Sequence, residues 1–178
     1  MAQITIRGSA NAKRGLIEMI EYINQTADVS QLTILEIGSY VGDSAEIFAQ
    51  RFGKVICVDP WQNGYDPKDA ASYQHPMSAI EEQFNRMAKQ YPNIEKRKMT
   101  SEENFLKYPF ELYDVVYIDG IHTYAGAKSD IKNYADRARL FLCGHDFQLR
   151  FQGVIDAVRE MVGEPHKVFS DTSWSFKR

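Results

Sequence analysis

Short apolar runs rich in β-branched residues alternate along this chain with longer segments whose apolar residues recur at helical spacing. Strands that alternate with helices in this way form a mostly parallel sheet with helices on both faces. The alternation therefore predicts an α/β fold built on a Rossmann-like, doubly wound sheet. The candidate strands lie at residues 32–37, 54–59, 94–99, 113–119 and 140–143.

The intervals between and after these runs carry the helix signal, and each gives one apolar face to the sheet. The apolar positions fall within residues 16–23, 47–51, 80–91, 124–134 and 154–161. Ser78 with Glu81, and Thr100 with Glu103, have the spacing of a capping box. This spacing predicts that two of the helices open at Ser78 and at Thr100.

No repeat or low-complexity linker divides the chain, so we expect a single domain over residues 1–178. Residues 1–31 precede the first strand as an N-terminal helical extension. Residues 60–76 contain three prolines, one glycine and three large aromatics without periodicity, which is typical of a binding loop, and we expect them at the active site. The tail at 166–178 alternates around Asp171-Thr172, which predicts a closing hairpin.

Charge and composition exclude several classes of protein. The formal net charge is −3, and no block of Lys or Arg provides the basic surface that nucleic-acid binding needs. Lys128, Asp130 and Arg137 fit the solvated face of one helix. No apolar stretch approaches the ~20 residues of a membrane span, and the polar start does not resemble a signal peptide. Cys57 and Cys143 sit inside apolar runs as core thiols, so we expect a cytoplasmic protein without nucleic-acid or membrane partners.

The segment 34–44 has the pattern of a buried strand, a tight turn and the start of a helix. Gly38 and Gly42 allow the backbone to approach a ligand above the C-terminal end of the strand, where open α/β sheets bind ligands. The spacing is G-x-x-x-G and not the G-x-G-x-x-G of dinucleotide sites, and Glu36 and Asp43 flank the turn without Lys or Arg. Two carboxylates repel a pyrophosphate but suit a ligand that is positive at that point.

S-adenosylmethionine, which carries a sulfonium and an ammonium group, is such a ligand. We therefore assign Glu36, Gly38, Ser39, Gly42 and Ser44 to cofactor binding. The alternative is that Glu36 only caps backbone amides in an ordinary turn between a strand and a helix.

Four further positions extend this cofactor site, and one of them is Asp119 at the end of the fourth strand. Asp59 ends the second strand, 21 residues after Gly38. In dinucleotide-binding folds, a carboxylate at this position accepts both hydroxyls of the ribose. Trp61 either packs on the adenine or ribose, or fills the core as a loop aromatic. Ser101 follows the third strand, where an adenine edge would lie, although a helix-capping role of residues 100–102 competes with this interpretation.

A second group of polar residues ends the fourth and fifth strands, whose carboxyl ends are neighbours in a doubly wound sheet. Asp119, His145 and Asp146 offer two carboxylates and an imidazole, which suit a divalent cation, with Mg²⁺ as first choice and Mn²⁺ as the alternative. His122 is placed to accept a hydroxyl proton as a general base. In a purely structural alternative, the two aspartates cap local turns and His145 binds loop carbonyls.

Four segments carry a resemblance to a known family. They are EIGSYVG at 36–42, VDP at 58–60, YIDGIHTYAG at 117–126 and GHDF at 144–147. In these segments the chain resembles the class I S-adenosylmethionine-dependent methyltransferases. Within that class it is similar to the small-molecule O-methyltransferases related to macrocin O-methyltransferase and cephalosporin hydroxylase-like proteins. The resemblance spans roughly residues 32–162 and implies a seven-stranded sheet with a reversed last strand.

The metal-dependent members of that family have an Asp-x-x-His that supplies a metal ligand and the base, and an acidic pair that ends the next strand. Asp119, His122 and Asp146 match this pattern, whereas His145 stands where an acidic residue is expected. The resemblance implies methyl transfer from S-adenosylmethionine to a hydroxyl of a small molecule, with help from a metal and a His base. A homo-oligomer is compatible with it. The alternatives are a non-catalytic nucleoside-binding or scaffold domain of the same fold and, less favoured by the glycine spacing, an NAD-linked oxidoreductase.

Overall fold

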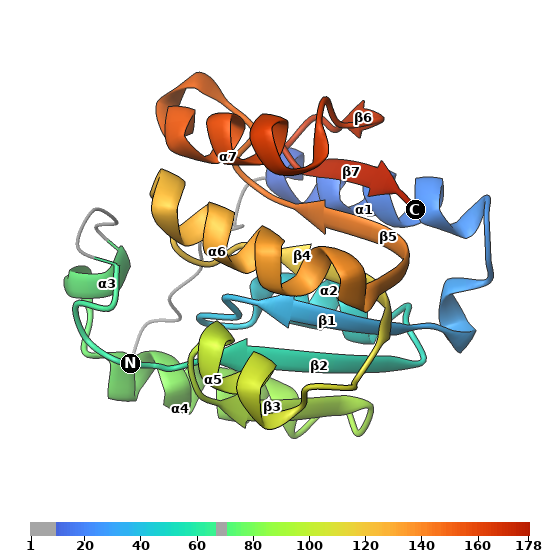
Figure 1. Ribbon diagram of the computed structural model, residues 1–178. Helices are drawn as coiled ribbons and strands as arrows, with labels where there is room; N and C mark the ends of the chain where they lie inside the picture. Colours follow the sequence, from blue (N-terminus) through green and yellow to red (C-terminus); the bar gives the residue numbers. More distant parts are fainter. Residues whose placement is uncertain (1–9, 67–70) are drawn as a thin grey trace.

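The computed structural model describes residues 10–66 and 71–178, which form a seven-stranded sheet between two layers of helices (Figure 1). The strands are β1 (Thr33–Ile37), β2 (Lys54–Asp59), β3 (Ile94–Lys98), β4 (Tyr113–Ile118), β5 (Ala138–Gly144), β6 (Lys167–Val168) and β7 (Trp174–Lys177). The helices are α1 (Ala10–Asn24), α2 (Asp43–Ala49), α3 (Ala71–Gln74), α4 (Met77–Ala88), α5 (Ser101–Lys107), α6 (Tyr124–Tyr134) and α7 (Gln152–Val162). Short 3₁₀ turns lie at Val29–Gln31, Ala135–Arg137 and Leu149–Phe151.

The order of the strands across the sheet is β3-β2-β1-β4-β5-β7-β6. Strands β1 to β5 are parallel to one another, and β7 runs antiparallel to both β5 and β6. The chain lays β1 to β3 toward one edge and then β4 and β5 toward the other, so the order reverses between β1 and β4. The prediction of a Rossmann-like, doubly wound sheet with a reversed last strand is confirmed.

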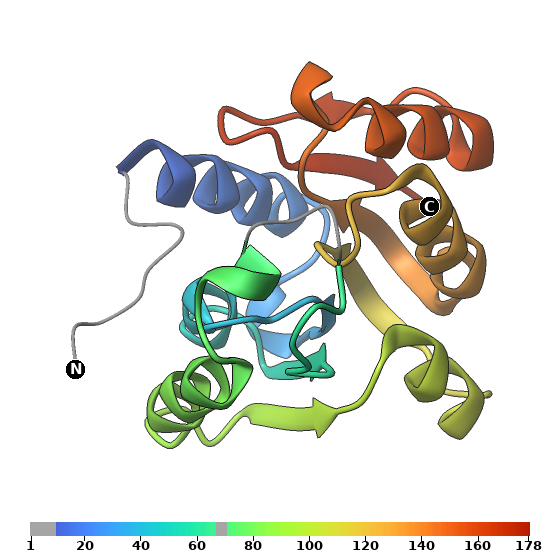
Figure 2. The same ribbon diagram turned by 90° about the vertical axis from the view of Figure 1, so that its left-hand side faces the viewer.

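Side chains that alternate along the strands belong to two separate cores. In β2, Val55 and Cys57 pack with residues of α1, α2 and α4, whereas Ile56 and Val58 pack with residues of α6 and α7. Figure 2 shows the first group of helices on one side of the sheet and α5, α6 and α7 on the other. Because both faces are covered, the central strands are continuous apolar runs. Within the described residues, no helix has the length and apolar character needed to cross a membrane.

One of the two predicted helix starts is confirmed and the other is wrong. At α5, the Thr100 side chain accepts the backbone N–H of Glu103 at 3.1 Å, and the Glu103 side chain accepts the backbone N–H of Thr100 at 2.8 Å. The capping box predicted at Ser78 does not form, because Pro76 occupies the cap position and Ser78 already lies in the first turn of α4. A capping residue must lie outside the helical turns.

The predicted hairpin in the tail is present, since β6 and β7 pair antiparallel around the turn at Asp171-Thr172. The carbonyl of Thr172 accepts the backbone N–H of Phe147 at 3.1 Å, so the turn lies against the loop that follows β5. The segment 60–76 contains the short helix α3, and its residues 67–70 fall outside the described residues. In the expected N-terminal extension, residues 1–9 fall outside them as well.

Candidate active site

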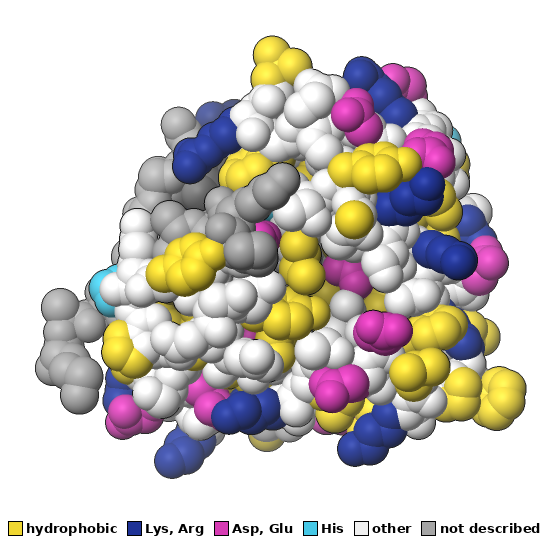
Figure 3. Space-filling view, turned by 60° about the vertical axis from the view of Figure 1, so that its left-hand side comes forward, with side chains coloured by type: hydrophobic (Ala, Val, Ile, Leu, Met, Phe, Trp, Pro, Cys, Tyr) yellow, Lys and Arg dark blue, Asp and Glu magenta, His cyan; other side chains and the backbone are white. Residues whose placement is uncertain are grey.

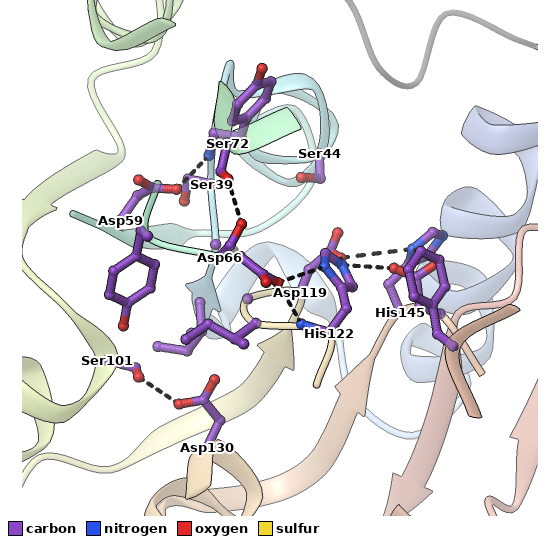
Figure 4. A pocket seen from close by; sticks show the side chains of 18 of the residues that line it. Ser39, Ser44, Asp59, Asp66, Ser72, Ser101, Asp119, His122, Asp130 and His145 are labelled. Carbon is purple, nitrogen blue, oxygen red and sulfur yellow. Dashed lines mark hydrogen bonds and ion pairs between the residues drawn. The ribbon is translucent and has the colours of Figure 1, made fainter. Parts of the chain in front are cut away.

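A cavity of about 560 Å³ opens over the C-terminal ends of β1, β2, β4 and β5. Its volume is in the range of small-molecule sites, and it spans the point where the strand order reverses. This face of the molecule is hollowed near its centre, with acidic and hydrophobic side chains visible inside (Figure 3). Asp59 and Ser101 line one end of the cavity, and His122 and His145 line the other (Figure 4).

The glycine turn after β1 forms part of the cavity wall. Gly38 adopts a φ of +89°, and a Cβ atom there would lie 2.0 Å from the carbonyl oxygen of Asp119. Only glycine therefore allows the turn after β1 to lie this close to the turn after β4. Gly42 also has a positive φ, +93°, but it faces Met87 of α4 and is not a lining residue.

Glu36 is fully buried beneath this turn and does not line the cavity. Its Oε2 accepts a hydrogen bond from Oγ of Ser39 at 2.6 Å, and its Oε1 accepts one from Oγ of Ser44. Both serines line the cavity. Glu36 thus fixes two hydroxyls at the wall, and its carboxylate reaches a ligand only through them.

Backbone groups position Asp59 at the end of β2. Its Oδ2 accepts the N–H of Tyr40 at 2.9 Å and its Oδ1 accepts the N–H of Trp61 at 2.7 Å, while burial raises the pKa of the carboxyl. Asp59 lines the cavity, but Trp61 does not. The Trp61 ring is 4% exposed and packs with its centroid 4.8 Å from that of Phe84. Trp61 therefore fills the core, which is the second of the two roles predicted for it, and does not contact the cavity.

Four polar side chains from the ends of β4 and β5 meet at the other end of the cavity. Nε2 of His122 lies 2.9 Å from Oδ2 of Asp146 and 3.7 Å from Oδ1 of Asp119. Nδ1 of His145 lies 3.2 Å from Oδ1 of Asp146 and 3.7 Å from Oδ1 of Asp119. Each carboxylate therefore faces both imidazoles, and we call these four residues the acidic centre.

The charges of the acidic centre control its protonation. Burial disfavours the charged form of His122, but hydrogen bonds and charges from Asp119 and Asp146 outweigh it and raise the pKa of His122 to about 11. Burial acts against the ionised form of Asp146 too, but its contacts with His122 and His145 hold the pKa of that carboxyl well below its usual range. His122 is thus an imidazolium between two carboxylates at neutral pH.

The three predicted metal ligands fit a divalent cation. One ligand atom from each of Asp119, His145 and Asp146 lies within 4.8 Å of the others. Two carboxylate oxygens and an imidazole nitrogen suit Mg²⁺ or Mn²⁺, and also Fe²⁺ or Zn²⁺. Asp146 adopts a φ of +61°, a left-handed conformation that Asp tolerates better than most non-glycine residues.

Two acidic residues that no sequence pattern marks as functional contact the acidic centre. Asp66, from the segment 60–76, is 6% exposed, and its Oδ2 accepts the backbone N–H of His122 at 3.0 Å and lies 3.5 Å from Nδ1 of the ring. Asp171, in the turn between β6 and β7, places Oδ2 3.9 Å from Nε2 of His145. The predicted hairpin located Asp171 at a turn, whereas no local pattern distinguishes Asp66 from any loop aspartate.

The prediction that Asp130 belongs to a solvated helix face is wrong. Asp130 is 4% exposed, lines the cavity, and accepts a hydrogen bond on Oδ1 from Oγ of Ser101 at 2.5 Å. The reason is the register of α6: Asp130 lies three residues after Ala127 and one before Ile131, both buried, so it falls on the inward face of the helix. The structure thus brings the predicted cofactor residue Ser101 together with an unexpected partner.

The fold and the cavity together define a class of protein. A seven-stranded sheet of this order with a reversed last strand, and an acidic cavity where the order reverses, are those of a class I S-adenosylmethionine-dependent methyltransferase. The family described as "Methyltransferase domain" matches residues 35–140, and the chain belongs to that family. It is therefore an S-adenosylmethionine-dependent methyltransferase, which disfavours the NAD-linked alternative.

Several solved structures share the fold. Calicheamicin methyltransferase CalS11 is 12% identical, with a TM-score of 0.64, over 95% of this chain and 80% of that chain. A candidate O-methyltransferase from Klebsiella pneumoniae is 15% identical, with a TM-score of 0.61, over 98% and 81% of the two chains. Magnesium protoporphyrin IX methyltransferase from Synechocystis PCC 6803, solved with S-adenosylmethionine bound, is 11% identical, with a TM-score of 0.60, over 99% and 85%. No curated protein matches the sequence.

Proposed function

We propose that this chain transfers the methyl group of S-adenosylmethionine to a hydroxyl of a small molecule, with His122 as general base. Asp119, His145 and Asp146 are the proposed ligands of a divalent cation. One observation carries the proposal: Nε2 of His122 lies 2.9 Å from Asp146 and 3.7 Å from Asp119 in the same cavity that Asp59 lines. A base, a cation-binding centre and a polar wall for a nucleoside share one space.

The cofactor roles of the wall residues are part of this proposal. Asp59 accepts one backbone N–H on each carboxylate oxygen, which leaves lone pairs for the two ribose hydroxyls. Gly38, Ser39 and Ser44 line the same space. The acidic centre attracts a positively charged group and repels phosphates. S-adenosylmethionine, when bound, supplies a methyl group on a positively charged sulfur.

His122 must lose its proton before it can act as a base. Its pKa of about 11 arises because two carboxylates favour the imidazolium, so a base role requires that they be engaged by another cation. Asp119, His145 and Asp146 would hold a divalent cation, which would supply that charge and polarise a substrate oxygen. The neutral ring of His122 then takes the hydroxyl proton at Nε2.

The remaining bond changes balance this proton transfer. The acceptor oxygen forms a bond to the methyl carbon as the bond from carbon to sulfur breaks, and the electron pair stays on sulfur. The products are a methyl ether, S-adenosylhomocysteine and a protonated His122. The hydrogen bond from the backbone N–H of His122 to Asp66 keeps the base at its position beside the acidic centre.

The size and charge of the cavity support a small acceptor. A volume of about 560 Å³ accommodates a nucleoside cofactor and a small acceptor molecule. A net charge of −3 and the acidic centre disfavour a polyanion such as nucleic acid. Two of the proteins with this fold are named for small molecules, calicheamicin and magnesium protoporphyrin IX.

Calorimetric titration of the chelator-treated protein with S-adenosylmethionine and S-adenosylhomocysteine, repeated with Mg²⁺ and Mn²⁺, tests binding. We expect micromolar cofactor binding and a separate metal heat that disappears in Asp119→Ala. Transfer of a labelled methyl group to a panel of small hydroxyl compounds tests catalysis. Asp119→Ala and His122→Ala should abolish transfer and retain affinity for S-adenosylhomocysteine, whereas Asp136→Ala, which removes a side chain that is 93% exposed, should change neither.

The outcomes separate the parts of the proposal. Cofactor binding without a metal response would refute the ligand set and leave a metal-independent enzyme with His122 as the candidate base. Absence of cofactor binding would refute the whole proposal and favour the scaffold alternative, in which the fold persists without chemistry.

A further inference from the structure

Asp130 is a buried carboxylate in the cavity that the proposed methyl transfer does not use. It is 4% exposed, and its only hydrogen bond within residues 10–66 and 71–178 is the one that its Oδ1 accepts from Ser101 at 2.5 Å. In the same part of the chain, no Lys, Arg or His forms an ion pair with it. Figure 4 shows Ser101 and Asp130 together on one side of the cavity, away from His122 and His145.

The second oxygen of this carboxylate is directed into the cavity. Oδ2 of Asp130 lies near the turn after β4, where a Cβ atom added to Gly120 would be 3.2 Å from it. Since Oδ1 already accepts the hydroxyl of Ser101, the carboxylate is fixed in orientation and Oδ2 remains to accept from a ligand. Thr100 and Glu103 form the capping box of α5, so the hydroxyl of Ser101 is not needed as a helix cap.

A buried carboxylate with one hydroxyl partner is unfavourable unless a ligand completes its hydrogen bonds. The matching ligand group is a hydrogen-bond donor, because a carbonyl or phosphate oxygen would be repelled. Asp59, Ser101 and Asp130 lie on the same side of the cavity (Figure 4). A planar base attached to a ribose at Asp59 therefore extends toward Asp130.

We propose that Asp130, oriented by Ser101, selects adenine in the bound cofactor by accepting a hydrogen bond from its 6-amino group. This inference rests on the proposed function only through the cofactor, S-adenosylmethionine. A purine with an oxygen at position 6 presents an acceptor to the same carboxylate and is rejected. Asp130 is thus a specificity-determining residue contributed by α6, and Ser101 is its positioning residue.

The experiment compares two ligands that differ at this one position. S-adenosylhomocysteine carries the 6-amino group, and S-inosylhomocysteine carries a 6-oxo group in its place. Calorimetry on the wild-type protein should show a preference for the adenine compound of about 100-fold or more. In Asp130→Asn, the amide offers both a donor and an acceptor, so the preference should fall below about 10-fold and binding of the inosine compound should improve.

Matched variants distinguish base selection from a general loss of structure. Asp136→Asn, an exposed carboxylate just after the same helix, should leave both affinities unchanged. Asp59→Asn should weaken both compounds by the same factor, because both carry the ribose. Ser101→Ala should reduce the preference without improving binding of the inosine compound, since the carboxylate remains but is no longer oriented.

Equal affinity of the wild-type protein for the two compounds would overturn the inference and leave the proposed function intact. An unchanged preference in Asp130→Asn, with the variant folded by circular dichroism, would also overturn it. If neither compound bound to the wild-type protein, both this inference and the cofactor site of the proposed function would be refuted.

Discussion

Replacement of Asp130 by Asn should make the free protein more stable at neutral pH. Burial raises the pKa of Asp130 from its ordinary value of 3.8 to about 6, although the hydrogen bond from Ser101 acts in the opposite direction. One pKa unit corresponds to about 1.4 kcal/mol, so the ionised carboxylate lowers the free energy of unfolding by about 3 kcal/mol. Asn has the same shape and keeps an acceptor for Ser101, but it has no charge to desolvate.

The sign of the pH dependence follows from proton binding. Between pH 3.8 and about 6, the folded protein keeps the proton on Asp130 that the unfolded chain releases. The contribution of this group to stability therefore falls as the pH rises through that window. The advantage of Asp130→Asn should be complete above about pH 6 and absent below pH 3.8. Carboxyls with a lowered pKa, such as Glu81, act in the opposite direction but equally in both proteins.

Denaturant unfolding of the two proteins, at pH values from about 4 to about 7.5, measures this difference directly. We expect it to grow from near zero to about 3 kcal/mol, or roughly 6–12 °C in Tm. Asp136→Asn serves as the exposed control and should show no such growth. If Asp130→Asn were as stable as the wild-type protein or less so at the highest pH, the carboxylate would be stabilised by the fold and the reasoning from burial would be wrong.

Three other substitutions test separate contacts. His122→Ala should lower kcat by about 10²- to 10⁴-fold with affinity for S-adenosylhomocysteine unchanged in calorimetry, and a loss of that affinity would contradict the base assignment. Asp66→Ala should lower kcat by about 10-fold because it releases the backbone N–H of His122. Asp66→Asn retains an acceptor and should keep most of the activity. Equal losses of kcat in the two variants would exclude this hydrogen bond as the cause. Gly38→Ala should lower Tm far more than Gly163→Ala, although both glycines have a φ of +89°. A Cβ atom at position 38 would lie 2.0 Å from the carbonyl oxygen of Asp119, whereas a Cβ atom at position 163 would have nothing within 4 Å. Similar decreases in Tm for the two glycine variants would show that the positive φ, and not the contact with Asp119, causes the loss of stability.

Much of the fold is predictable because its determinants are local. The strand predicted at 54–59 has those bounds in the structure, since a buried parallel strand is a continuous apolar run. The turn at Asp171-Thr172 follows from the alternation on either side of it. The prediction that α4 starts at Ser78 is wrong because Pro76, with its restricted φ, takes the cap position, although Ser78 has capping-box spacing.

The residues of the acidic centre are predictable for a topological reason. Asp119, His145 and Asp146 each follow a strand directly, and parallel strands end at one edge of the sheet, so sequence position implies proximity. Asp66 and Asp130 have no such signal. The first depends on the path of an irregular segment, and the second depends on the rotation of α6, where one polar residue interrupts an apolar face.

The two ends of the cavity hold their carboxylates in different ways. In the acidic centre, imidazole nitrogens lie within ion-pair distance of Asp119 and Asp146, and their contacts hold the pKa of Asp146 well below its usual range. At the other end, N–H and O–H donors hold Asp59 and Asp130, and burial raises the pKa of both. A cation suits the first end, and the neutral hydroxyl and amino donors of a nucleoside suit the second. Because those donors favour the ionised carboxylates, S-adenosylhomocysteine should raise the Tm of the wild-type protein above pH 6 by more than it raises that of Asp130→Asn.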